Sequence, residues 1–391
     1  MKNPLVIGFD AKRIVRNRTG LGSYGRTLVN DLSLHDDLQL RLYAPDAGHD
    51  DMRLQVKDRP NLTFCYPEGH LLLGKSYWRS RSIVSQLQRD GVQIYHGLSG
   101  ELPAGIRHSG IKSVVTIHDL IFMRHPEYYH WIDTKLYEWK FRQAIREADS
   151  IVAISECTRR DICELGNIDE DRVTVIYQSC APRFSTEPDV KLMEQVRRKY
   201  RLPRRFILNV GSIEERKNVL LAVRALHHLP EDVSLVVVGR RTGYTEKVRQ
   251  YADSHMLAHR VFMLQGITDE ELPAFYHLAD AFVYPSRYEG FGIPIIEAIS
   301  AGLPVVACTG SCLEEAGGPD SLYVDPDADE DFAAAVGQVL SGAPGRQQRI
   351  ERSQEYISRF RNADAAGHFV SLYSSLPFLQ SSGRSRTRRE Q

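Results

Sequence analysis

The chain has 391 residues, and its 50 lysines and arginines are balanced by 50 aspartates and glutamates. A balanced charge creates no field that would collect a polyanion, so we expect no nucleic-acid partner and expect an anionic ligand to be held by local groups. Hydrophobic residues make up 42% of the chain, which is typical of a globular protein, and the length predicts about two domains.

Two further features bear on location. The six cysteines include no Cys-x-x-Cys pair, which favours reduced thiols in a cytosolic compartment. No apolar run approaches the roughly 20 residues that cross a bilayer. We therefore expect a cytoplasmic protein, with peripheral attachment to the inner membrane surface as a hypothesis.

Short apolar, β-branched runs alternate with helical patterns along the chain, which predicts βαβ units around parallel sheets. In the first half the expected strands are 5–9, 38–44, 62–66, 93–95, 113–117, 151–154 and 173–176. In the second half they are 206–210, 235–238, 261–264, 281–284, 305–307 and 322–324. The polar, proline-containing stretch 178–189 predicts a linker between the two series. Residues 350–376 are predicted to form a helix.

Near the start, residues 20–25 match Gly-x-Gly-x-x-Gly. A dinucleotide-binding fingerprint follows its strand directly, whereas residues 10–18 intervene here. An acidic residue further along, Asp46, keeps an NAD-dependent oxidoreductase open as an interpretation. The plainer alternative is a flexible turn before a helix that begins near Ser23.

The strand 113–117 is followed by His118 and Asp119. The carboxyl ends of parallel strands present ligands to a crevice, so both side chains are candidates for a site. A lone histidine is more often structural, and we expect Asp119 to brace the loop.

In the second half, the strand 206–210 is followed by a loop that carries Arg216 and Lys217. A planar guanidinium and a compact ammonium would together neutralise a diphosphate. The alternative for such a pair is a solvated surface loop.

The most informative segment is 284–298, in which a strand ends, glycines follow and Pro294 opens a helix. Proline suits the first helical position, and free amides at a helix N-terminus bind phosphate. Glu289 and Glu297 flank this anion site and could accept hydrogen bonds from the vicinal hydroxyls of a sugar or a ribose. The bland alternative is a strand-to-helix turn with two solvated glutamates.

Two Asp-x-Asp sequences lie within 325–329. This motif can hold a divalent ion on a diphosphate, but a turn followed by a helix N-cap accounts for it here. We expect no metal.

The segment from Glu289 to Glu297, continuing to Val306, resembles the Glu-x7-Glu motif of the retaining glycosyltransferases of family 4. Residues 211–218 resemble the phosphate-binding loop of the same family. The resemblance implies the GT-B fold: an α/β protein with two Rossmann-like domains that face each other across a cleft, and a C-terminal helix that crosses back to the N-terminal domain. On that pattern the acceptor domain is 1–185 plus a helix at about 365–378, the donor domain is 186–364, and 379–391 is a disordered basic tail.

The resemblance also assigns roles. Glu297 would bind the donor ribose, Glu289 the hydroxyls of the transferred sugar, and His118 that same sugar, so that His118 and Glu289 are the catalytic candidates. The remaining donor-binding candidates are the diphosphate cations Arg216 and Lys217, the backbone of Phe291, Gly292 and Ile293, the base-contacting Ile267, and Gly22 in a loop that closes on the diphosphate.

The function that these residues predict is transfer of a hexose, with mannose as the first candidate, from a nucleotide diphosphate sugar with retention of configuration. The sugar nucleotide is a co-substrate, and no cofactor is expected. The acceptor would be a glycan or a lipid-linked glycan, recognised in the first half, where 75–81 and 128–131 mix aromatic and basic residues. Inward packing of those aromatics is the alternative interpretation. A non-hydrolysing sugar-nucleotide epimerase and a non-catalytic sugar-nucleotide-binding protein remain open.

Overall fold

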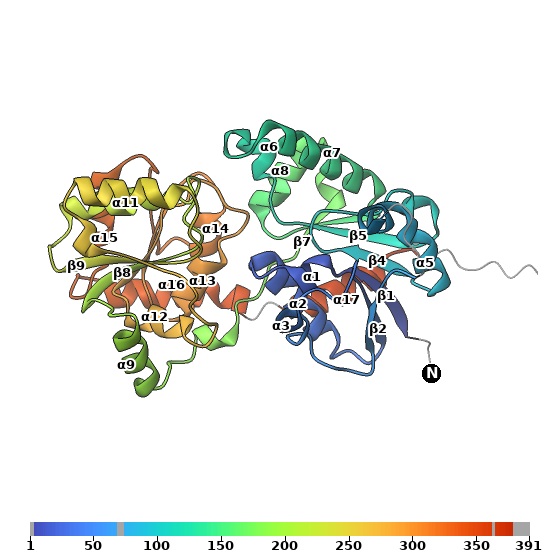
Figure 1. The fold of residues 1–391 in the computed structure, drawn as a ribbon, viewed down its shortest axis with the longest axis horizontal. Helices are drawn as coiled ribbons and strands as arrows, with labels where there is room; N and C mark the ends of the chain where they lie inside the picture. The colour runs from blue at the N-terminus through green and yellow to red at the C-terminus, as the bar shows by residue number, and fades with distance from the viewer. Residues whose placement is uncertain (1–3, 69–73, 362–363, 378–391) are drawn as a thin grey trace, which may run out of the picture. The chain divides into compact units, whose positions relative to one another are not determined.

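The computed structural model describes residues 4–68, 74–361 and 364–377, and it contains two parallel sheets covered by helices (Figure 1). The strands are β1 Leu5–Asp10, β2 Leu38–Tyr43, β3 Leu62–Cys65, β4 Ile94–Gly97, β5 Lys112–Ile117, β6 Ser150–Ala153, β7 Val173–Val175, β8 Arg205–Val210, β9 Val233–Val238, β10 Val261–Leu264, β11 Ala281–Tyr284, β12 Val305–Cys308 and β13 Leu322–Val324. Every strand predicted from the sequence is present, with ends that differ by a residue or two.

The first sheet has seven strands in the order β3-β2-β1-β4-β5-β6-β7, and the second has six in the order β10-β9-β8-β11-β12-β13. In each sheet the strand order reverses beside the first strand of the series, between β1 and β4 and between β8 and β11. Open parallel sheets bind ligands at such a switch point, outside the carboxyl ends of the strands. The α/β fold with two Rossmann-like sheets is therefore confirmed.

The helices are α1 Lys12–Arg16, α2 Gly20–Leu32, α3 Asp50–Arg53, α4 Gly74–Tyr77, α5 Ile83–Arg89, α6 Ile121–Arg124, α7 Trp131–Glu147, α8 Glu156–Gly166, α9 Val190–Lys199, α10 Val219–Ala225, α11 Tyr244–Ser254, α12 Leu272–Leu278, α13 Ile293–Ser300, α14 Leu313–Gly317, α15 Asp329–Gly337, α16 Arg346–Arg361 and α17 Ala365–Ser375. A π-helical turn, η1, covers Trp78–Ser82, and short 3₁₀ turns cover Ile106–His108, Pro126–Tyr128, Glu170–Arg172, Pro182–Phe184, Leu226–His228 and Ala258–Arg260.

The second sheet is buried on both faces, as its near-continuous apolar strands predict. Along β8, Phe206 and Leu208 enter one core cluster, while Ile207 enters another. Helices α12, α13 and α16 contribute to the first cluster, and α10, α11 and α15 contribute to the second. Figure 1 shows α11 and α15 on one side of β8 and β9, with α12, α13 and α16 on the other. Because apolar side chains pack on both faces of this sheet, its carboxyl edge has a fixed position.

The chain groups into two compact units. The first contains 1–117, 139–152 and 365–391, and the second contains 118–138 and 153–364. Helix α7 and the edge of the first sheet therefore contribute to both units. The domain boundary expected at residues 185 and 186 stays a prediction.

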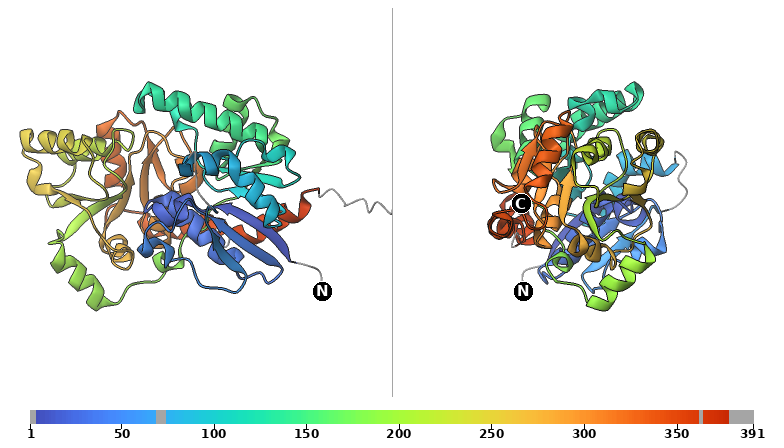
Figure 2. Two further views of the ribbon diagram at one scale, coloured as in Figure 1. Left: turned by 45° about the vertical axis from the view of Figure 1, so that its right-hand side comes forward. Right: turned by 90° about the vertical axis from the view of Figure 1, so that its left-hand side faces the viewer.

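The C-terminal helix α17 belongs to the first unit and packs on α2. Its Tyr373 hydroxyl lies 2.7 Å from Nδ1 of His96 on β4, and the His96 Nε2 lies 2.8 Å from the Thr116 hydroxyl. Figures 1 and 2 both place α17 beside the strands nearest the N-terminus. The return of the last helix to the first unit, expected from the resemblance, is confirmed.

The segment 350–376, predicted to be helical, contains most of α16 and all of α17, with Phe360 of α16 packed in the second unit and Tyr373 of α17 in the first. Two local expectations were wrong. Helix α2 begins at Gly20 rather than near Ser23, so the glycines of the Gly-x-Gly-x-x-Gly match lie inside a helix. Pro294 is the second residue of α13, not the first. The tail 379–391 lies outside the described residues.

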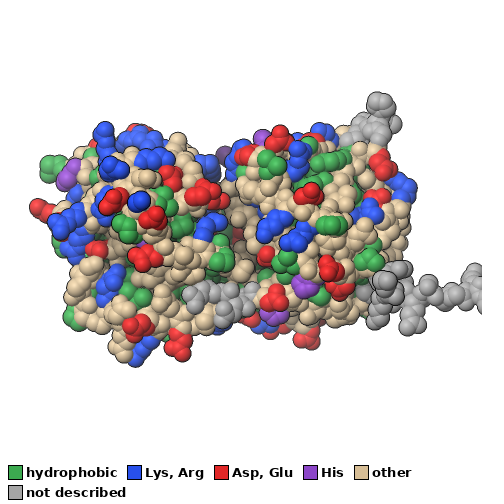
Figure 3. All heavy atoms as spheres, turned by 90° about the horizontal axis from the view of Figure 1, so that it is seen from below, with side chains coloured by type: hydrophobic (Ala, Val, Ile, Leu, Met, Phe, Trp, Pro, Cys, Tyr) green, Lys and Arg blue, Asp and Glu red, His purple; other side chains and the backbone are tan. Residues whose placement is uncertain are grey.

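Cationic and anionic side chains are interspersed over the face of the molecule shown in Figure 3. On this face the positive and negative charges are mixed and are not separated into two large patches of opposite sign. Among the described residues, no helix is both long and apolar enough to cross a membrane.

Candidate active site

The site is built in the second unit on the two strands at its switch point. The loop after β8 carries Arg216 and Lys217 and ends at Asn218, whose left-handed φ of 51° lets the chain turn directly into α10. The loop after β11 carries Glu289 and leads into α13. The Arg287 amide donates to the Arg216 carbonyl at 2.9 Å, which ties the two loops together.

Glu289 is the centre of the cluster. Its side chain is only 12% exposed, and its Oε1 accepts hydrogen bonds from Lys217 Nζ at 2.9 Å, Ser286 at 2.8 Å and Tyr284 at 3.1 Å. Its Oε2 lies 3.0 Å from Nη1 of Arg216. Burial alone would raise the pKa of Glu289, but the charges of Lys217 and Arg216 outweigh it and lower the pKa to about 2. Glu289 is therefore an anion held between two cations.

The two cations are similarly fixed. Lys217 Nζ also donates to the Tyr284 hydroxyl at 2.9 Å and lies 5.1 Å from the centroid of that ring. Arg216 donates to the Tyr288 carbonyl. Burial opposes the charge on each side chain, yet the Glu289 carboxylate raises the pKa of both above their ordinary values. Both remain charged at any physiological pH.

The N-terminus of α13 offers free backbone donors. Gly292 is its N-cap, with a φ of 102° that a residue with a Cβ rarely adopts, and no side chain caps the helix. The amides of Phe291, Gly292 and Ile293 donate to no acceptor within the part of the chain that the structure describes. Unsatisfied amides at the positive end of a helix dipole form an anion site. Phe291 is buried and stacks on Tyr177 with a centroid distance of 5.5 Å, which anchors the turn.

His118 and Asp119 lie against this turn, within the same unit. A Cβ added to Gly290 would lie 2.2 Å from the His118 carbonyl oxygen, so only glycine allows this approach. Thr158 donates to both carbonyls, that of His118 at 3.1 Å and that of Gly290 at 3.1 Å. The His118 Nδ1 lies 3.3 Å from the Gln178 amide nitrogen. The structure therefore brings the His118 loop and the Glu289 loop together.

Asp119 has its own brace and its own charge environment. Its Oδ1 accepts from the Ile121 amide at 3.2 Å. Burial raises the pKa of Asp119, with Arg216 opposing the rise and Glu289 adding to it. This carboxyl is thus close enough to feel both members of the Arg216–Glu289 pair.

Glu297 lies on α13, five residues after the N-cap Gly292. The Tyr276 hydroxyl of α12 donates to its Oε2 at 2.8 Å. Burial raises the pKa of Glu297 to about 7. The charges of Arg183 and Asp269 act on it from nearby. Asp269 and Ile267 lie on the same loop after β10, so the predicted base-contacting loop is near the predicted ribose carboxylate.

Gly22 belongs to the first unit and has a local structural reason to be glycine. A Cβ there would lie 1.9 Å from the Asn17 carbonyl oxygen. The Asn17 side chain accepts from the amides of Thr19 at 2.8 Å and Gly22 at 3.2 Å, which fixes the start of α2. These contacts neither support nor oppose its predicted role at a diphosphate.

The Asp-x-Asp residues are engaged in local contacts. Asp325 Oδ1 accepts from the Asp327 amide at 2.8 Å, and Asp327 forms an ion pair with Arg287. Within 4–68, 74–361 and 364–377, no group of three or more His, Cys, Asp or Glu side chains is placed to hold a metal ion.

Comparison with known proteins identifies the family. Residues 19–179 match "Glycosyltransferase Family 4", and residues 193–356 match "Glycosyl transferases group 1". The chain is a GT-B glycosyltransferase.

The similar proteins agree. The enzyme is 26% identical over 372 residues to the O-antigen chain mannosyltransferase B of Escherichia coli, which covers 92% of this chain and 96% of that protein. It is 25% identical over 261 residues to the O-antigen chain mannosyltransferase RfbU of Salmonella typhimurium, which covers 67% of each. Its fold matches a glycosyltransferase structure from Rickettsia africae with a TM-score of 0.74 at 16% identity, over 96% of this chain and 98% of that one. Both matching families are transferases, which favours transfer over the epimerase and the oxidoreductase.

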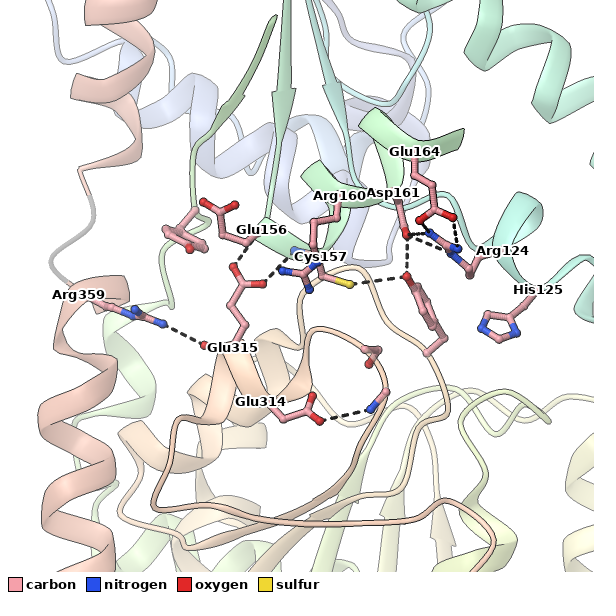
Figure 4. A pocket seen from close by; sticks show the side chains of 14 residues that line it. Arg124, His125, Glu156, Cys157, Arg160, Asp161, Glu164, Glu314, Glu315 and Arg359 are labelled. Carbon is pink, nitrogen blue, oxygen red and sulfur yellow. Dashed lines mark hydrogen bonds and ion pairs between the residues drawn. The ribbon is translucent and has the colours of Figure 1, made fainter. Parts of the chain in front are cut away.

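A cavity of about 840 Å³ in the glycosyltransferase's second unit is lined by Tyr288, the residue before Glu289, and by residues of α8 and α14 (Figure 4). The Glu315 carboxylate accepts from the amides of Glu156 at 2.7 Å and Cys157 at 3.1 Å, at the first turn of α8. The Tyr288 hydroxyl donates to Asp161 at 2.6 Å, and Asp161 also pairs with Arg124. The bond to Asp161 holds the side chain of Tyr288, which is next to Glu289 in the sequence.

Sequence reasoning did not find the tyrosines of this site. Tyr284 and Tyr276 are both buried, and each donates to one of the two motif glutamates. Tyr284 is the last residue of β11, so its position at a strand's carboxyl end was a usable signal. Tyr276 lies within α12 among apolar residues, and nothing in the pattern separates it from the core.

Proposed function

We propose that this glycosyltransferase moves a hexose, with mannose as the first candidate, from a nucleotide diphosphate sugar to a glycan or lipid-linked glycan of a bacterial surface polysaccharide. The reaction retains the anomeric configuration and uses no metal. The observation that carries the proposal is the set of free amides at the start of α13, beside the Arg216–Glu289–Lys217 cluster. The names of the E. coli and Salmonella relatives support mannose and O-antigen synthesis.

The donor diphosphate would bind the Phe291, Gly292 and Ile293 amides together with Arg216 and Lys217. As the glycosidic bond breaks, negative charge accumulates on the leaving nucleoside diphosphate, and donors already aimed at it stabilise that state most. Lys217 is held in the site by hydrogen bonds to Glu289 and Tyr284.

Glu289 would accept hydrogen bonds from the sugar hydroxyls, and Glu297 would accept them from the ribose. Glu289 is ionised at all working pH values, because its pKa is about 2, so both of its oxygens act only as acceptors. No side chain is assigned as nucleophile or base: a donor phosphate oxygen takes the proton of the attacking acceptor hydroxyl. His118 would contact the transferred sugar and align it.

A thermal-shift screen against GDP-, UDP-, dTDP- and ADP-sugars tests donor binding, because a matched donor at 100 times its Kd stabilises the folded protein by about 2.7 kcal/mol. The shift should be lost in Lys217→Gln and kept in Lys191→Gln, an exposed lysine on α9 that lies outside the site. NMR of the product then reads its anomeric configuration. Absence of a shift with every donor, or an inverted product, would refute the proposal.

Peripheral membrane contact is part of the proposal. Helix α7 begins with Trp131, which is 75% exposed, followed by the exposed Ile132. In the other aromatic segment, 75–81, Trp78 packs inward instead: it is buried and donates to Gln86 at 3.1 Å. Flotation with anionic liposomes should recover the wild type and lose Trp131→Ser. Recovery of neither protein would remove the membrane contact, and equal recovery of both would show that Trp131 does not make it.

A further inference from the structure

A pocket of about 420 Å³ opens in the first unit, outside the site described above. Its walls include Lys12 and Arg16 of α1, Asp46 after β2, and Glu101 after β4. Since β2, β1 and β4 are neighbours in the sheet, the pocket lies at the carboxyl edge, beside the strand-order switch point. This is where an open parallel sheet binds a ligand.

The pocket is strongly cationic for a protein with no net charge. Five of its lining side chains are cations and two are carboxylates, and the buried Asp10, which pairs with Arg79 at 3.3 Å, adds a third negative charge, so two positive charges remain in surplus. The cations are Lys12, Arg16, Lys75, Arg79 and Lys140. A concave, low-dielectric wall with one sign of charge concentrates ligands of the opposite sign.

The carboxylates are shared, and one lysine has no partner. Asp46 pairs with both Arg16 and Lys75, and Glu101 pairs with both Arg79 and Lys140. Lys12 makes no side-chain hydrogen bond or ion pair with any residue that the structure describes. Burial lowers the pKa of Lys12, and the Arg79 guanidinium lowers it further.

An anion would remove the penalty that this arrangement carries. A partly buried ammonium without a partner loses hydration, and a neighbouring guanidinium repels it. Glu101 and Asp10 act on Lys12 from nearby without forming an ion pair with it. A bound group with two negative charges would pair with Lys12 directly and offset the remaining surplus. Phosphate suits such a cluster, because it offers several oxygens to several donors.

The pocket also offers an aromatic surface. Trp139 of α7 lines it and is 58% exposed, and Tyr77 of α4 lines it and is 41% exposed. Large aromatic side chains left open to solvent beside polar groups mark binding sites. An indole face suits the apolar face of a pyranose ring, so the walls suit a molecule with both a sugar ring and a phosphate.

We propose that this pocket binds a phosphate-bearing sugar of the acceptor, with Lys12 as the principal phosphate ligand and Trp139 as the stacking surface for the ring. The proposal rests on the proposed transferase function, for which it names the chemical class of acceptor. Arg16, Lys75 and Arg79 complete the phosphate site, and the shared carboxylates keep these cations in place.

Titration calorimetry of the full chain with glucose 1-phosphate, inorganic phosphate and methyl α-glucoside separates the contributions. Glucose 1-phosphate should bind at least tenfold more tightly than the neutral glucoside, because charge-assisted hydrogen bonds are the stronger ones. It should also bind more tightly than inorganic phosphate, because the ring adds the contact with Trp139. Equal affinity for glucose 1-phosphate and the glucoside would overturn the proposal.

Matched variants place the ligand. Lys12→Gln should weaken glucose 1-phosphate about tenfold, whereas Arg13→Gln, on the same helix but outside the pocket lining, should change it less than twofold. Trp139→Leu should weaken glucose 1-phosphate but not inorganic phosphate, with Trp131→Leu on the same helix as control. Binding that survives Lys12→Gln but is lost in Lys217→Gln would place the phosphate at the α13 site and refute the proposal.

The donor screen distinguishes this proposal from the proposed function. Lys12→Gln should keep the donor-induced thermal shift, because Lys12 lies in the first unit and the donor cations in the second. Lys12-dependent binding of glucose 1-phosphate without any donor shift would support the pocket and count against the transferase mechanism. A normal donor shift together with unchanged binding in Lys12→Gln would do the reverse.

Discussion

Replacing Glu289 with glutamine should destabilise the second unit by about 3 kcal/mol at pH 7. The pKa of Glu289 is lowered from 4.5 to about 2, and each unit of pKa shift corresponds to about 1.4 kcal/mol. Glutamine keeps the shape and can still accept from Ser286, but it leaves Arg216 and Lys217 facing each other without a counter-ion. Removing one partner of a buried ion pair typically costs about 3 to 5 kcal/mol, which agrees with this value.

The pH dependence of that difference follows from the direction of the shift. Because the pKa of Glu289 is lower in the folded state, its stabilisation is complete above about 4.5 and is lost as the pH falls through about 2. The stability gap between wild type and Glu289→Gln should therefore close across this range. Acid brings the wild type down toward the variant, whose residue 289 does not titrate.

Hydrogen exchange of the α13 peptides, followed by mass spectrometry, measures this opening in the second unit without assuming that the whole chain unfolds in one step. At pH 7 the variant should exchange roughly two orders of magnitude faster than the wild type. Glu214→Gln is the matched control, since Glu214 lies at 4.0 Å from Arg216 and is more exposed, and it should change exchange only slightly. Equal exchange in Glu289→Gln and wild type, or a gap that persists in acid, would refute the argument.

Three further predictions follow from the same site. Donor affinity should rise between about pH 6 and 8 as Glu297 ionises, because its pKa is about 7 and only the carboxylate accepts from both ribose hydroxyls. Titrations of donor binding across this pH range should show the rise in the wild type and no pH dependence in Glu297→Gln. Gly290→Ala should lower the free energy of unfolding, measured by chemical denaturation, by about 2 kcal/mol or more and abolish most of the activity, since the added Cβ meets the His118 carbonyl at 2.2 Å. Gly337→Ala, which has open space around the added Cβ, should raise the free energy of unfolding in the same assay. Transfer activity should be unchanged by EDTA; loss of activity that Mg²⁺ or Mn²⁺ restores would overturn the metal-free mechanism.

The sequence predicted the scaffold well because both signals involved are local. Continuous apolar runs such as Val233–Val238 predict strands buried on both faces, and the alternation with helices predicts parallel order. The carboxyl-edge rule places the loops after β8 and β11 at the same edge of the sheet. In the structure Arg216, Lys217 and Glu289 do meet there.

What the sequence could not supply was the set of partners. The sequence predicts that Glu289 and Glu297 both accept hydrogen bonds from hydroxyls, yet their environments drive their pKa values in opposite directions, to about 2 and about 7. The difference comes from side chains that are distant in sequence, two cations for Glu289 and a tyrosine for Glu297. Long-range pairing of this kind leaves no periodic signal in one sequence.

The cationic pocket of the first unit shows the same limit. Lys12, Lys75 and Lys140 are separated by more than sixty positions from one to the next, and only the sheet topology brings their segments to one edge. The zero net charge of the chain argued against any anion-collecting surface, and that inference holds for the molecule as a whole. It does not hold locally, because the cations that line this pocket outnumber the carboxylates that pair with them.

The charge in the donor site has a consequence for how the proposed diphosphate would bind. Arg216 and Lys217 supply two positive charges, Glu289 removes one, and the α13 dipole adds about half a charge. A sugar diphosphate brings about two negative charges, so it is not fully neutralised while Glu289 remains between the cations. If the sugar hydroxyls become the hydrogen-bond donors to Glu289, the cations can turn toward the phosphates. Recognition of the sugar and stabilisation of the leaving group would then be coupled through the Glu289 carboxylate. This coupling accounts for the burial of Glu289 between the two cations.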